Sequence, residues 1–461
     1  MVEKLFGTSG IRGSIQSKVT TDMALNLGRS LGTTLKGTGI VGVGTDARTS
    51  KDMLKNAFIA GMLSTGVNVI DLGFAPMPVV AAHSTFSPIK TSVIITASHN
   101  PSGDNGFKFF KNGREYIRSE EKNIERCISM EKYHVANWTS TGTVSKYDIY
   151  ENYMIRAKHF LSKRGAQGRG MRVLVDLANG AAVPYTPVLL RELGFSVTTI
   201  NAHPDGHFPG RPAEPSPKNL EDTMRIASTS DFSLTVCHDG DGDRLAVIDE
   251  AGNFIDQNRI IALFARDEVR RRDGGLVVVS IDTSSVIDDV IKAEGGSIIR
   301  APLGSLQEIF SKRKEEVVFS SEPWKPIFTA FGWWMDGIVG AARITQMVQD
   351  EGEESCIQLM KSIPEYPMLR EHIKCPDKCK SKFMDSIRIL IEDQVTNIEQ
   401  IIDVDGVRVE RNDGSYVLIR VSGTEPKARV YIGAKKRETL EKLAAQARKI
   451  METALEHAKK E

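Results

Sequence analysis

The fold of this chain is constrained most by a strand–helix–strand pattern that occurs three times. The pattern begins at Ile40, restarts at Arg172 and restarts again at Leu276. In each repetition short apolar strands alternate with helical segments, which implies mainly parallel sheets covered by helices on both faces. At 461 residues, the chain is also too long for one hydrophobic core. The sequence therefore predicts an α/β protein with three similar domains built on mainly parallel, mixed sheets.

A polar residue follows the last strand of each repetition. The last strand of the first repetition leads into Ser98, that of the second into an acidic loop at Asp239, and that of the third into Glu322. Open α/β sheets bind their ligands at the carboxyl ends of the strands. We therefore expect these three strand ends to contribute to one site.

The C-terminal part of the chain has a different pattern. Two expected strands, Gly406–Glu410 and Tyr416–Val421, flank a polar hairpin turn that contains a glycine. A strand over Lys427–Ala434 then precedes a long amphipathic helix over Glu438–Lys459. Hairpin strands followed by a helix predict a small α+β domain. The expected domains are residues 1–150, 151–255, 256–370 and 371–461.

The composition argues against several classes of protein. With 60 basic and 59 acidic residues, the chain offers no overall attraction to nucleic acid or an anionic membrane. It lacks an apolar run of about 18 residues, and its N-terminus lacks the apolar core of a secretory signal. Five cysteines, an odd and small number, argue against a disulfide framework and predict a cytoplasmic protein. Cys375 and Cys379 have a spacing that suits a metal, but a structural zinc site needs four ligands.

The acidic loop His238–Arg244 carries three carboxylates, Asp239, Asp241 and Asp243, separated by glycines. Without a cation, such like charges push at least one carboxyl toward protonation. The glycines allow the backbone to turn so that all three carboxylates meet at one ion. A small number of oxygen ligands favours Mg²⁺, whereas a calcium loop fits less well because the segment before Glu250 is strand-like. A solvated acidic turn also fits less well, since an arginine and an apolar strand follow.

Ser98 lies within Thr96–Pro101, where a buried strand is expected to end and the side chain can project into a cleft. A serine beside a histidine is usually structural, and no G-x-S-x-G elbow surrounds this one. With three metal-binding carboxylates elsewhere, phosphoryl chemistry becomes the better interpretation, because a cation neutralises charge on a phosphate carried by serine. Lys108, which follows closely, is a candidate acid, base or phosphate ligand.

Two further segments are candidate anion sites. Arg420–Pro426, with Arg429 beyond it, combines glycine and hydroxyl residues in a turn beside an arginine. Such a turn presents backbone N–H groups, and a guanidinium matches phosphate oxygens; an ordinary hairpin connection is the alternative. Gly7–Gly13 lacks the spacing of a nucleotide P-loop. Its Arg12 is able to touch an anion, although the motif alone is more typical of a surface turn.

Taken in order, these segments resemble the α-D-phosphohexomutase family, which includes phosphomannomutases, phosphoglucomutases and phosphoglucosamine mutases. The resemblance covers essentially the whole chain. It rests on the order and rough spacing of five segments, which are Gly7–Gly13, Thr96–Pro101, Asn105–Lys108, Asp239–Arg244 and Arg420–Pro426.

The resemblance implies a heart-shaped molecule of four domains around a central cleft. Ser98 would carry a phosphoryl group, and Asp239, Asp241 and Asp243 would bind Mg²⁺ together with an oxygen on Ser98. Arg244 would lie alongside these carboxylates, and the transferring group would be surrounded by Arg12, His99, Asn100 and Lys108. The residues that hold the other phosphate would be Arg420, Ser422, Gly423 and Thr424, with Arg429 as a further substrate-binding candidate.

The activity that the resemblance implies is the interconversion of a sugar 6-phosphate and a sugar 1-phosphate. The phosphoserine would give its phosphoryl group to the sugar, the bisphosphorylated intermediate would reorient, and the other phosphate would return to the serine. The same bisphosphate would act as activator. A small-molecule phosphosugar is thus the expected partner, with no nucleic acid and no membrane. The sequence leaves open whether the chain forms a homo-oligomer.

The loop expected to contact the sugar departs from the family's pattern. That loop usually contains Glu-x-Ser-Gly-His or Glu-x-Asn-Gly-Gly, whereas this chain has Glu322 followed by Pro323, Trp324 and Lys325. Glu322 can accept hydrogen bonds from two sugar hydroxyls, and the preceding loop at Gly304 departs only modestly. Trp324 is either a wall against the sugar or a packing residue, and Lys325 would add a charge.

Three alternative functions stay open at this point. One is that the substrate is a pentose phosphate instead of a hexose phosphate. A phosphatase would use Ser98 and the acidic loop but pass the phosphoryl group to water, and it would not need a second phosphate site. A non-catalytic sugar-phosphate sensor would also explain the altered loop, but it would not need an intact serine and three carboxylates.

We predict that Arg420→Ala mainly weakens substrate binding. Arg420 is assigned to the phosphate that does not react, and such a contact contributes similarly to the ground state and the transition state. We expect a raised KM, a smaller loss of kcat and a Ser98 that can still be phosphorylated, measured by steady-state kinetics and intact mass. An unchanged KM with a collapsed kcat would instead assign the loop to the reacting end.

Overall fold

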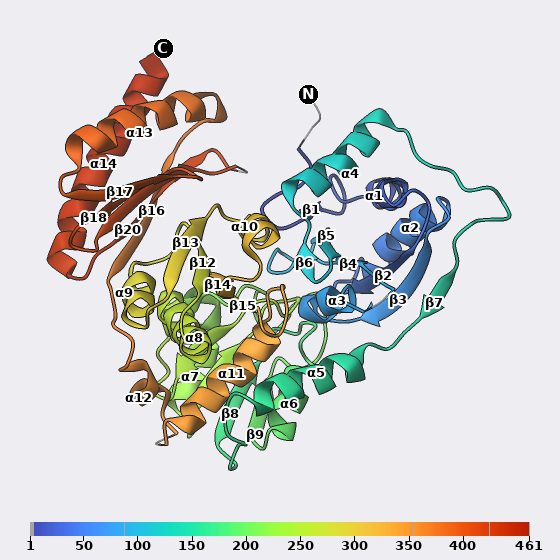
Figure 1. Cartoon of the computed structure of the whole chain (residues 1–461), viewed down its shortest axis with the longest axis horizontal. Helices are drawn as coiled ribbons and strands as arrows, with labels where there is room; N and C mark the ends of the chain where they lie inside the picture. Colours follow the sequence, from blue (N-terminus) through green and yellow to red (C-terminus); the bar gives the residue numbers. More distant parts are fainter. Residues whose placement is uncertain (1–3, 87, 353, 424, 461) are drawn as a thin grey trace. The chain divides into compact units, whose positions relative to one another are not determined.

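The computed structural model describes residues 4–86, 88–352, 354–423 and 425–460. It divides into two compact units. The first unit extends to Gln257 and includes Trp324–Ser362, and the second contains Asn258–Pro323 and Ile363–Glu461. The first three sheets contain parallel strands and the last is antiparallel (Figure 1). This confirms the predicted fold class, three α/β sheets followed by an α+β domain.

The first sheet carries the strands of residues 11–146. Its strands are β1 (Ile11–Ser14), β2 (Ile40–Thr45), β3 (Asn68–Phe74), β4 (Thr91–Ile95), β5 (Asp104–Lys111), β6 (Arg114–Glu115) and β7 (Val144–Lys146). Their order is β1-β5-β4-β2-β3-β7, with β6 paired to β5. Strands β4, β2, β3 and β7 are parallel, whereas β5 runs antiparallel to β1 and β4. Strand β5 was not predicted, and it places Lys108 opposite Ile94, one residue before the end of β4.

The second sheet also belongs to the first unit. Its strands are β8 (Arg172–Asp176), β9 (Ser196–Ile200), β10 (Leu234–Cys237) and β11 (Ala246–Asp249). In the order β11-β10-β8-β9, the last three are parallel and β11 is antiparallel to β10. The helices of this unit are α1 (Thr21–Thr34), α2 (Lys51–Leu63), α3 (Met77–His83), α4 (Arg118–Met130), α5 (Tyr150–Ser162), α6 (Thr186–Glu192), η1 (Pro217–Leu220), α7 (Glu221–Ser228), α11 (Gly337–Asp350) and α12 (Cys356–Met360).

The second unit contains the third and fourth groups of strands. The parallel strands β12 (Leu276–Ser280), β13 (Ser297–Ala301) and β14 (Val317–Glu322) have β12 in the middle. The chain then re-enters the first unit at β15 (Lys325–Phe328). The antiparallel sheet has the order β16-β20-β19-β18-β17 and consists of β16 (Met368–Lys374), β17 (Ile398–Asp403), β18 (Val407–Arg411), β19 (Tyr416–Val421) and β20 (Lys427–Gly433).

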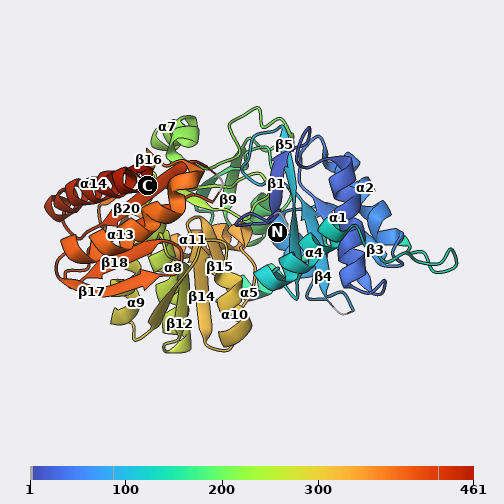
Figure 2. The ribbon, with the colours of Figure 1, turned by 90° about the horizontal axis from the view of Figure 1, so that it is seen from above.

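Helices complete the second unit. They are α8 (Gln257–Arg272), α9 (Val286–Ala293), α10 (Leu306–Arg313), η2 (Asp377–Cys379), α13 (Lys380–Gln394) and α14 (Arg437–Lys460). Helices α13 and α14 lie side by side against the antiparallel sheet (Figures 1 and 2). Cys375 and Cys379 are buried in the apolar core between them and the sheet. Neither cysteine belongs to a group of candidate metal ligands among the described residues.

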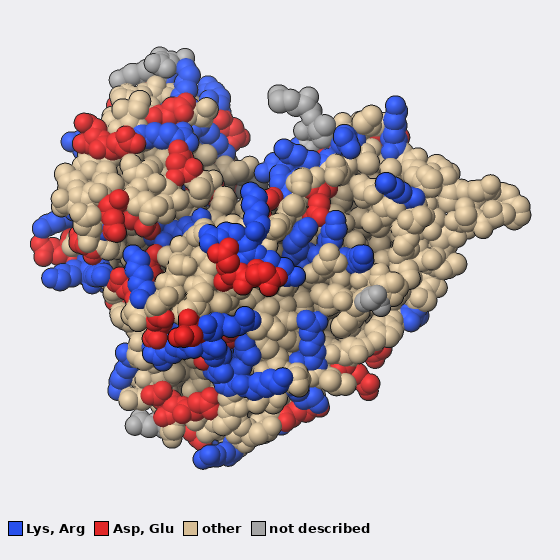
Figure 3. Space-filling model, in the orientation of Figure 1, with Lys and Arg blue, Asp and Glu red and all other residues tan. Residues whose placement is uncertain are grey.

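The surface and the helices add two observations. On the face in Figure 3, basic and acidic side chains are interspersed, in keeping with a net charge of +1. Within the described parts of the chain, no helix combines the length and the apolar character needed to cross a bilayer.

The antiparallel sheet begins with Met368, a few residues before the expected start of the last domain at residue 371. The four predicted domain ranges stay a prediction.

Helices α1 and α2 pack unusually closely in the first unit. A Cβ atom added at Gly61 would lie 2.2 Å from the carbonyl oxygen of Leu25, and one added at Gly28 would lie 2.1 Å from that of Phe58. Two glycines therefore let the backbones of the two helices touch. Because α2 follows directly after the end of β2, this packing also supports the loop between them.

We predict that Gly61→Ala destabilises the first unit by about 1–3 kcal/mol, because the added methyl group overpacks a contact between two backbones. The urea midpoint of unfolding should fall. Ala60→Ser is the matched control, since Ala60 is exposed on the same helix and a surface change is worth about 0.5 kcal/mol or less. Equal midpoints for the two variants would contradict this account of the helix contact.

Candidate active site

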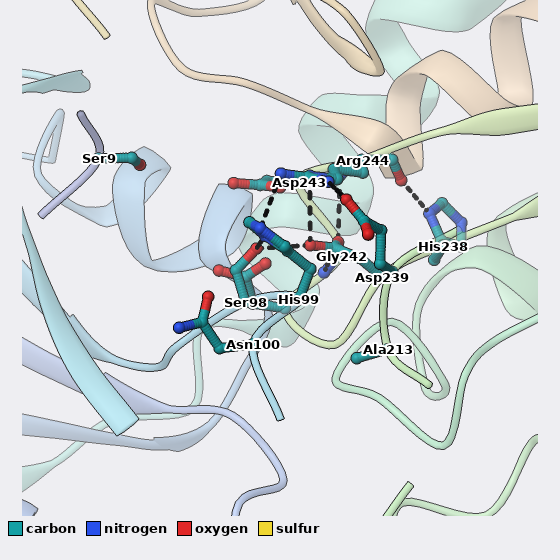
Figure 4. Close-up of polar contacts among 12 residues, drawn as sticks. Ser9, Ser98, His99, Asn100, Ala213, His238, Asp239, Gly242, Asp243 and Arg244 are labelled. Atoms are coloured by element: carbon teal, nitrogen blue, oxygen red, sulfur yellow. Dashed lines mark hydrogen bonds and ion pairs between the residues drawn. The ribbon is translucent and has the colours of Figure 1, made fainter. Parts of the chain in front are cut away.

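Ser98 is fully buried and lies in the serine loop, residues 96–104, which joins the end of β4 to the first residue of β5. Its Oγ donates a hydrogen bond of 2.6 Å to Oδ2 of Asp239, and it lies 3.3 Å from Nδ1 of His99. The backbone of Ser98 has a φ of +53°, a left-handed conformation that costs a non-glycine residue about 1–2 kcal/mol. The loop thus holds a strained serine that faces the acidic loop of the second sheet (Figure 4).

The acidic loop follows β10, and its three carboxylates are fully buried. One oxygen from each of Asp239, Asp241 and Asp243 lies within 4.8 Å of the others. Oδ1 of Asp241 and Oδ1 of Asp243 are buried without a hydrogen-bond partner. Buried carboxylate oxygens are normally paired or bound to a metal, so this group fits a cation. It is able to hold a metal ion.

Two glycines allow the acidic loop to approach Ser98. Gly242 has a φ of +73°, which favours glycine. A Cβ atom at Gly240 would lie 2.6 Å from the carbonyl oxygen of Ser98. A side chain at Gly240 would therefore push the serine loop and the acidic loop apart.

Lys108 joins the carboxylates from strand β5, where it pairs with Ile94 in the sheet register. Its Nζ donates hydrogen bonds of 2.8 Å to Asp241 and 2.7 Å to Asp243. Burial lowers the pKa of Lys108, but the two carboxylates outweigh it and raise the pKa above its ordinary value. Lys108 is therefore a fixed ammonium group that supplies positive charge within the acidic loop.

The pKa values of Asp239 and Asp243 are shifted in opposite directions. Burial, and then the charges of Asp241 and Asp243, raise the pKa of Asp239 well above its ordinary value. Burial also acts to raise the pKa of Asp243, but the nearby charges of Lys108, Lys325 and Arg244 lower it. Without a cation, the carboxylates are thus held together by the ammonium group of Lys108 and by the hydrogen bond that Ser98 donates to Asp239.

His99 lies between the serine loop and Arg244. Burial, and then the charges of Arg244, Arg12 and Lys325, strongly lower the pKa of His99, so its ring is neutral. Nη2 of Arg244 lies 3.4 Å from Nε2 of His99, and a guanidinium can only donate. Nε2 therefore accepts, which leaves the proton on Nδ1, facing Ser98.

The other predicted residues of the first unit take different positions. Nε and Nη2 of Arg12 are buried without hydrogen-bond partners, so its guanidinium is available to an anion. The side chain of Asn100 donates to Asp104 within the serine loop. Arg244 donates to Glu214 and lies over the ring of Trp324.

The loop after Glu322 departs from the family's pattern, and the sequence left open whether its Trp324 faces the sugar or packs against the protein. Trp324 packs with the buried cluster that contains Leu220 and Cys237, and its left-handed backbone has a φ of +69°. Lys325 is buried, and its charge acts on Asp243 and on His99. Trp324 thus packs beneath Arg244, and the charge of Lys325 lies close to the acidic loop.

The remaining predicted residues lie in the second unit. The backbone N–H of Gly304 donates a 2.6 Å hydrogen bond to Glu322. Nη2 of Arg420 lies 2.9 Å from Asp405, which also accepts from the backbone of Leu303.

The rest of the predicted phosphate loop is only partly described. Lys380 donates to the carbonyl oxygen of Ser422, and Arg429 pairs with Glu425. The space around the α-carbon of Gly423 is open. Thr424 lies outside the described residues.

Several residues of the site were not found from the sequence. Thr96 accepts a hydrogen bond from the backbone of Ser98, and Asp46 accepts one from Thr96. Asp405 links the two loops of the second unit. Asp46 directly follows the end of β2. A search for polar residues at strand ends, which identified Ser98 and Asp239, would also have identified Asp46.

Comparisons with known proteins cover nearly the whole chain. The sequence matches the four domains described as phosphoglucomutase/phosphomannomutase alpha/beta/alpha domains I, II and III and C-terminal domain, over residues 3–134, 151–252, 256–366 and 372–450. The chain belongs to the phosphoglucomutase/phosphomannomutase family. The resemblance stated from the motifs is therefore confirmed.

Individual relatives of this family member carry more than one name. A protein of Thermococcus kodakarensis named "Phosphopentomutase" is 39% identical over 96% of this chain and 97% of its own length. A "Probable phosphoglucosamine mutase" of Methanopyrus kandleri is 37% identical over 95% of this chain and 96% of its own length. A solved structure of a family protein from Burkholderia thailandensis has a TM-score of 0.85 at 23% identity and covers 98% of both chains, which shows the shared fold.

We predict that Lys108→Met destabilises the protein without a bound metal by about 3–5 kcal/mol, because two buried carboxylates lose the ammonium group that pairs with them. Adding MgCl₂ should raise the Tm of this variant more than that of the wild type, measured by differential scanning fluorimetry against chelator. Lys158→Met is the matched control, since Lys158 pairs with Glu192 at the surface of the same unit and such an exposed pair is worth about 0–1 kcal/mol. A variant as stable as the wild type in chelator would contradict the role of Lys108.

Proposed function

We propose that this phosphosugar mutase interconverts a sugar 6-phosphate and a sugar 1-phosphate through a phosphoserine at Ser98. The observation that carries the proposal is the 2.6 Å hydrogen bond between Ser98 and Asp239 within a group of carboxylates that fits a cation. Mg²⁺ is the proposed ion, because it prefers a few oxygen ligands and keeps positions open for phosphate oxygens. When bound, it would neutralise charge on the transferring phosphoryl group.

The residues around Ser98 divide the remaining work. Arg12 would bind oxygens of the phosphoryl group with its unpaired nitrogens, and Lys108 would supply a second fixed positive charge. When Ser98 takes a phosphoryl group from the sugar, Asp239 is placed to accept the hydroxyl proton. The Nδ1–H of His99 would orient the serine oxygen.

Residues of the second unit would bind the rest of the substrate. Glu322, held by the backbone of Gly304, would accept hydrogen bonds from sugar hydroxyls. Arg420, which pairs with Asp405, would exchange that partner for the phosphate that does not react, with Ser422, Gly423, Thr424 and Arg429 nearby in sequence. A sugar bisphosphate would be the intermediate and the activator.

The sugar itself has two candidates. We propose a hexose or hexosamine phosphate as the first, because relatives that align with nearly the whole chain carry the name "Probable phosphoglucosamine mutase". A pentose phosphate is the second, because a relative at 39% identity carries the name phosphopentomutase. The unusual residues Trp324 and Lys325 stand next to Glu322 in the chain, where the choice between these sugars would be made.

A panel of sugar phosphates tests the proposed function. We expect coupled assays with hexose, hexosamine and pentose phosphates to show isomer formation that requires Mg²⁺. Intact mass should show a species heavier by one phosphoryl group. Ser98→Ala should lack this species and should lose most of the activity. Release of inorganic phosphate without an isomer would make the chain a phosphatase. Full activity of Ser98→Ala, or in excess chelator, would contradict the mechanism.

A further inference from the structure

Arg48 lies in the loop after β2 and is fully buried. Its guanidinium donates four hydrogen bonds, all to backbone carbonyl oxygens of the serine loop. Nη2 binds the carbonyls of Ser98 at 2.9 Å and Asn100 at 2.6 Å, and Nη1 binds those of Pro101 at 2.5 Å and Asp104 at 2.7 Å. One side chain therefore holds the loop both at the reactive serine and beyond it.

Asp46 completes this arrangement from the same loop. One of its oxygens lies 3.3 Å from Nε of Arg48 and accepts a 2.6 Å hydrogen bond from the hydroxyl of Thr96. That hydroxyl in turn accepts a 2.8 Å hydrogen bond from the backbone N–H of Ser98. The two backbone polar groups of Ser98 are thus held from one ion pair, the N–H through Thr96 and the carbonyl through Arg48.

The loop 205–208 of the second sheet's domain covers Arg48. The ring of Phe208 lies 5.1 Å from the guanidinium carbon. A Cβ atom at Gly206 would lie 2.6 Å from the α-carbon of Arg48. Arg48 is therefore enclosed between the serine loop and the domain that carries the acidic loop.

The second sheet contains a similar pair. Asp176, at the end of β8, accepts a 2.8 Å hydrogen bond from Nε of Arg211. Nη2 of Arg211 donates a 2.7 Å hydrogen bond to the carbonyl of His238, immediately before Asp239. In each domain, an aspartate that follows or ends the neighbouring parallel strand holds an arginine, and the arginine holds the backbone of the reactive loop.

We propose that Arg48 and Asp46 are positioning residues that hold Ser98 in its left-handed conformation, with its oxygen aimed at Asp239. The proposal rests on the proposed function of Ser98. We call this pair of residues, Arg48 and Asp46, the clamp. Without the clamp, the strained serine loop would relax, and the serine oxygen would move away from the position needed for phosphoryl transfer. A lysine cannot replace the arginine, because an ammonium group has three donors and lacks the planar fork that reaches several carbonyls at once.

Arg48→Lys tests the clamp, because it keeps the positive charge beside Asp46. We expect kcat to fall about 100-fold, since misplacement of a reacting group by about 1 Å has an effect of this size. KM for the sugar phosphate should change little, because Arg48 is fully buried and its guanidinium donates to backbone carbonyls. A merely structural role would lower Tm and leave kcat per folded molecule unchanged, and that outcome would overturn the proposal.

Hydrogen exchange gives a second readout that does not depend on activity. In Arg48→Lys, the amides of residues 97–104 should exchange faster. Arg408→Lys is the matched control, since Arg408 is also fully buried and donates to the carbonyls of Ile281 and Thr283 in the second unit. It should lower Tm without changing exchange over residues 97–104. Equal exchange in wild type and Arg48→Lys would overturn the proposal.

Thr96→Val covers the case in which Arg48→Lys does not fold. It removes the hydroxyl that links the backbone of Ser98 to Asp46 and keeps the shape of the side chain. We expect the same faster exchange and a lower kcat, and wild-type values of both would overturn the proposal. If the wild type forms no isomer from any sugar phosphate, the proposed function fails, and the exchange measurement alone decides whether the clamp exists.

Discussion

In the first unit, one oxygen from each of three buried carboxylates lies within 4.8 Å of the others. Their mutual repulsion has to be compensated by neighbouring groups. Repulsion between such groups is strong where water is excluded. In the protein without ligands, Lys108 compensates two of them and Ser98 donates to the third. A divalent cation and a phosphoserine would satisfy the same oxygens. The charges that hold the site together are therefore the charges that phosphoryl transfer requires.

The scaffold places the reactive groups on loops but fixes those loops through buried side chains. Arg48 binds four carbonyls of the serine loop, and Arg211 binds the carbonyl that precedes the acidic loop. Each arginine is held by an aspartate at the end of a parallel strand. A loop fixed in this way can keep a strained residue such as Ser98, because the strain is offset by hydrogen bonds to its neighbours.

The departure of this chain from its family's pattern has a physical interpretation in the structure. Trp324 packs under Arg244, and Lys325 adds positive charge near Asp243 and His99. The two residues therefore contribute packing and charge near Arg244 and the acidic loop. The sequence alone left Trp324 open between a sugar wall and a packing residue, because an indole ring suits both places.

The sequence by itself determined the alternating α/β architecture, the strand ends at Ser98 and Asp239, and the three carboxylates, because strand periodicity and charge repulsion act over a few neighbouring residues. Strand β5, the ion pairs of Lys108 and the clamp of Arg48 and Asp46 were decided only by the tertiary structure. Arg48 is 50 residues from Ser98 in the chain, and Lys108 is 133 residues from Asp241. Local patterns carry no information on such contacts, since they form only when separate strands take their places in the sheets.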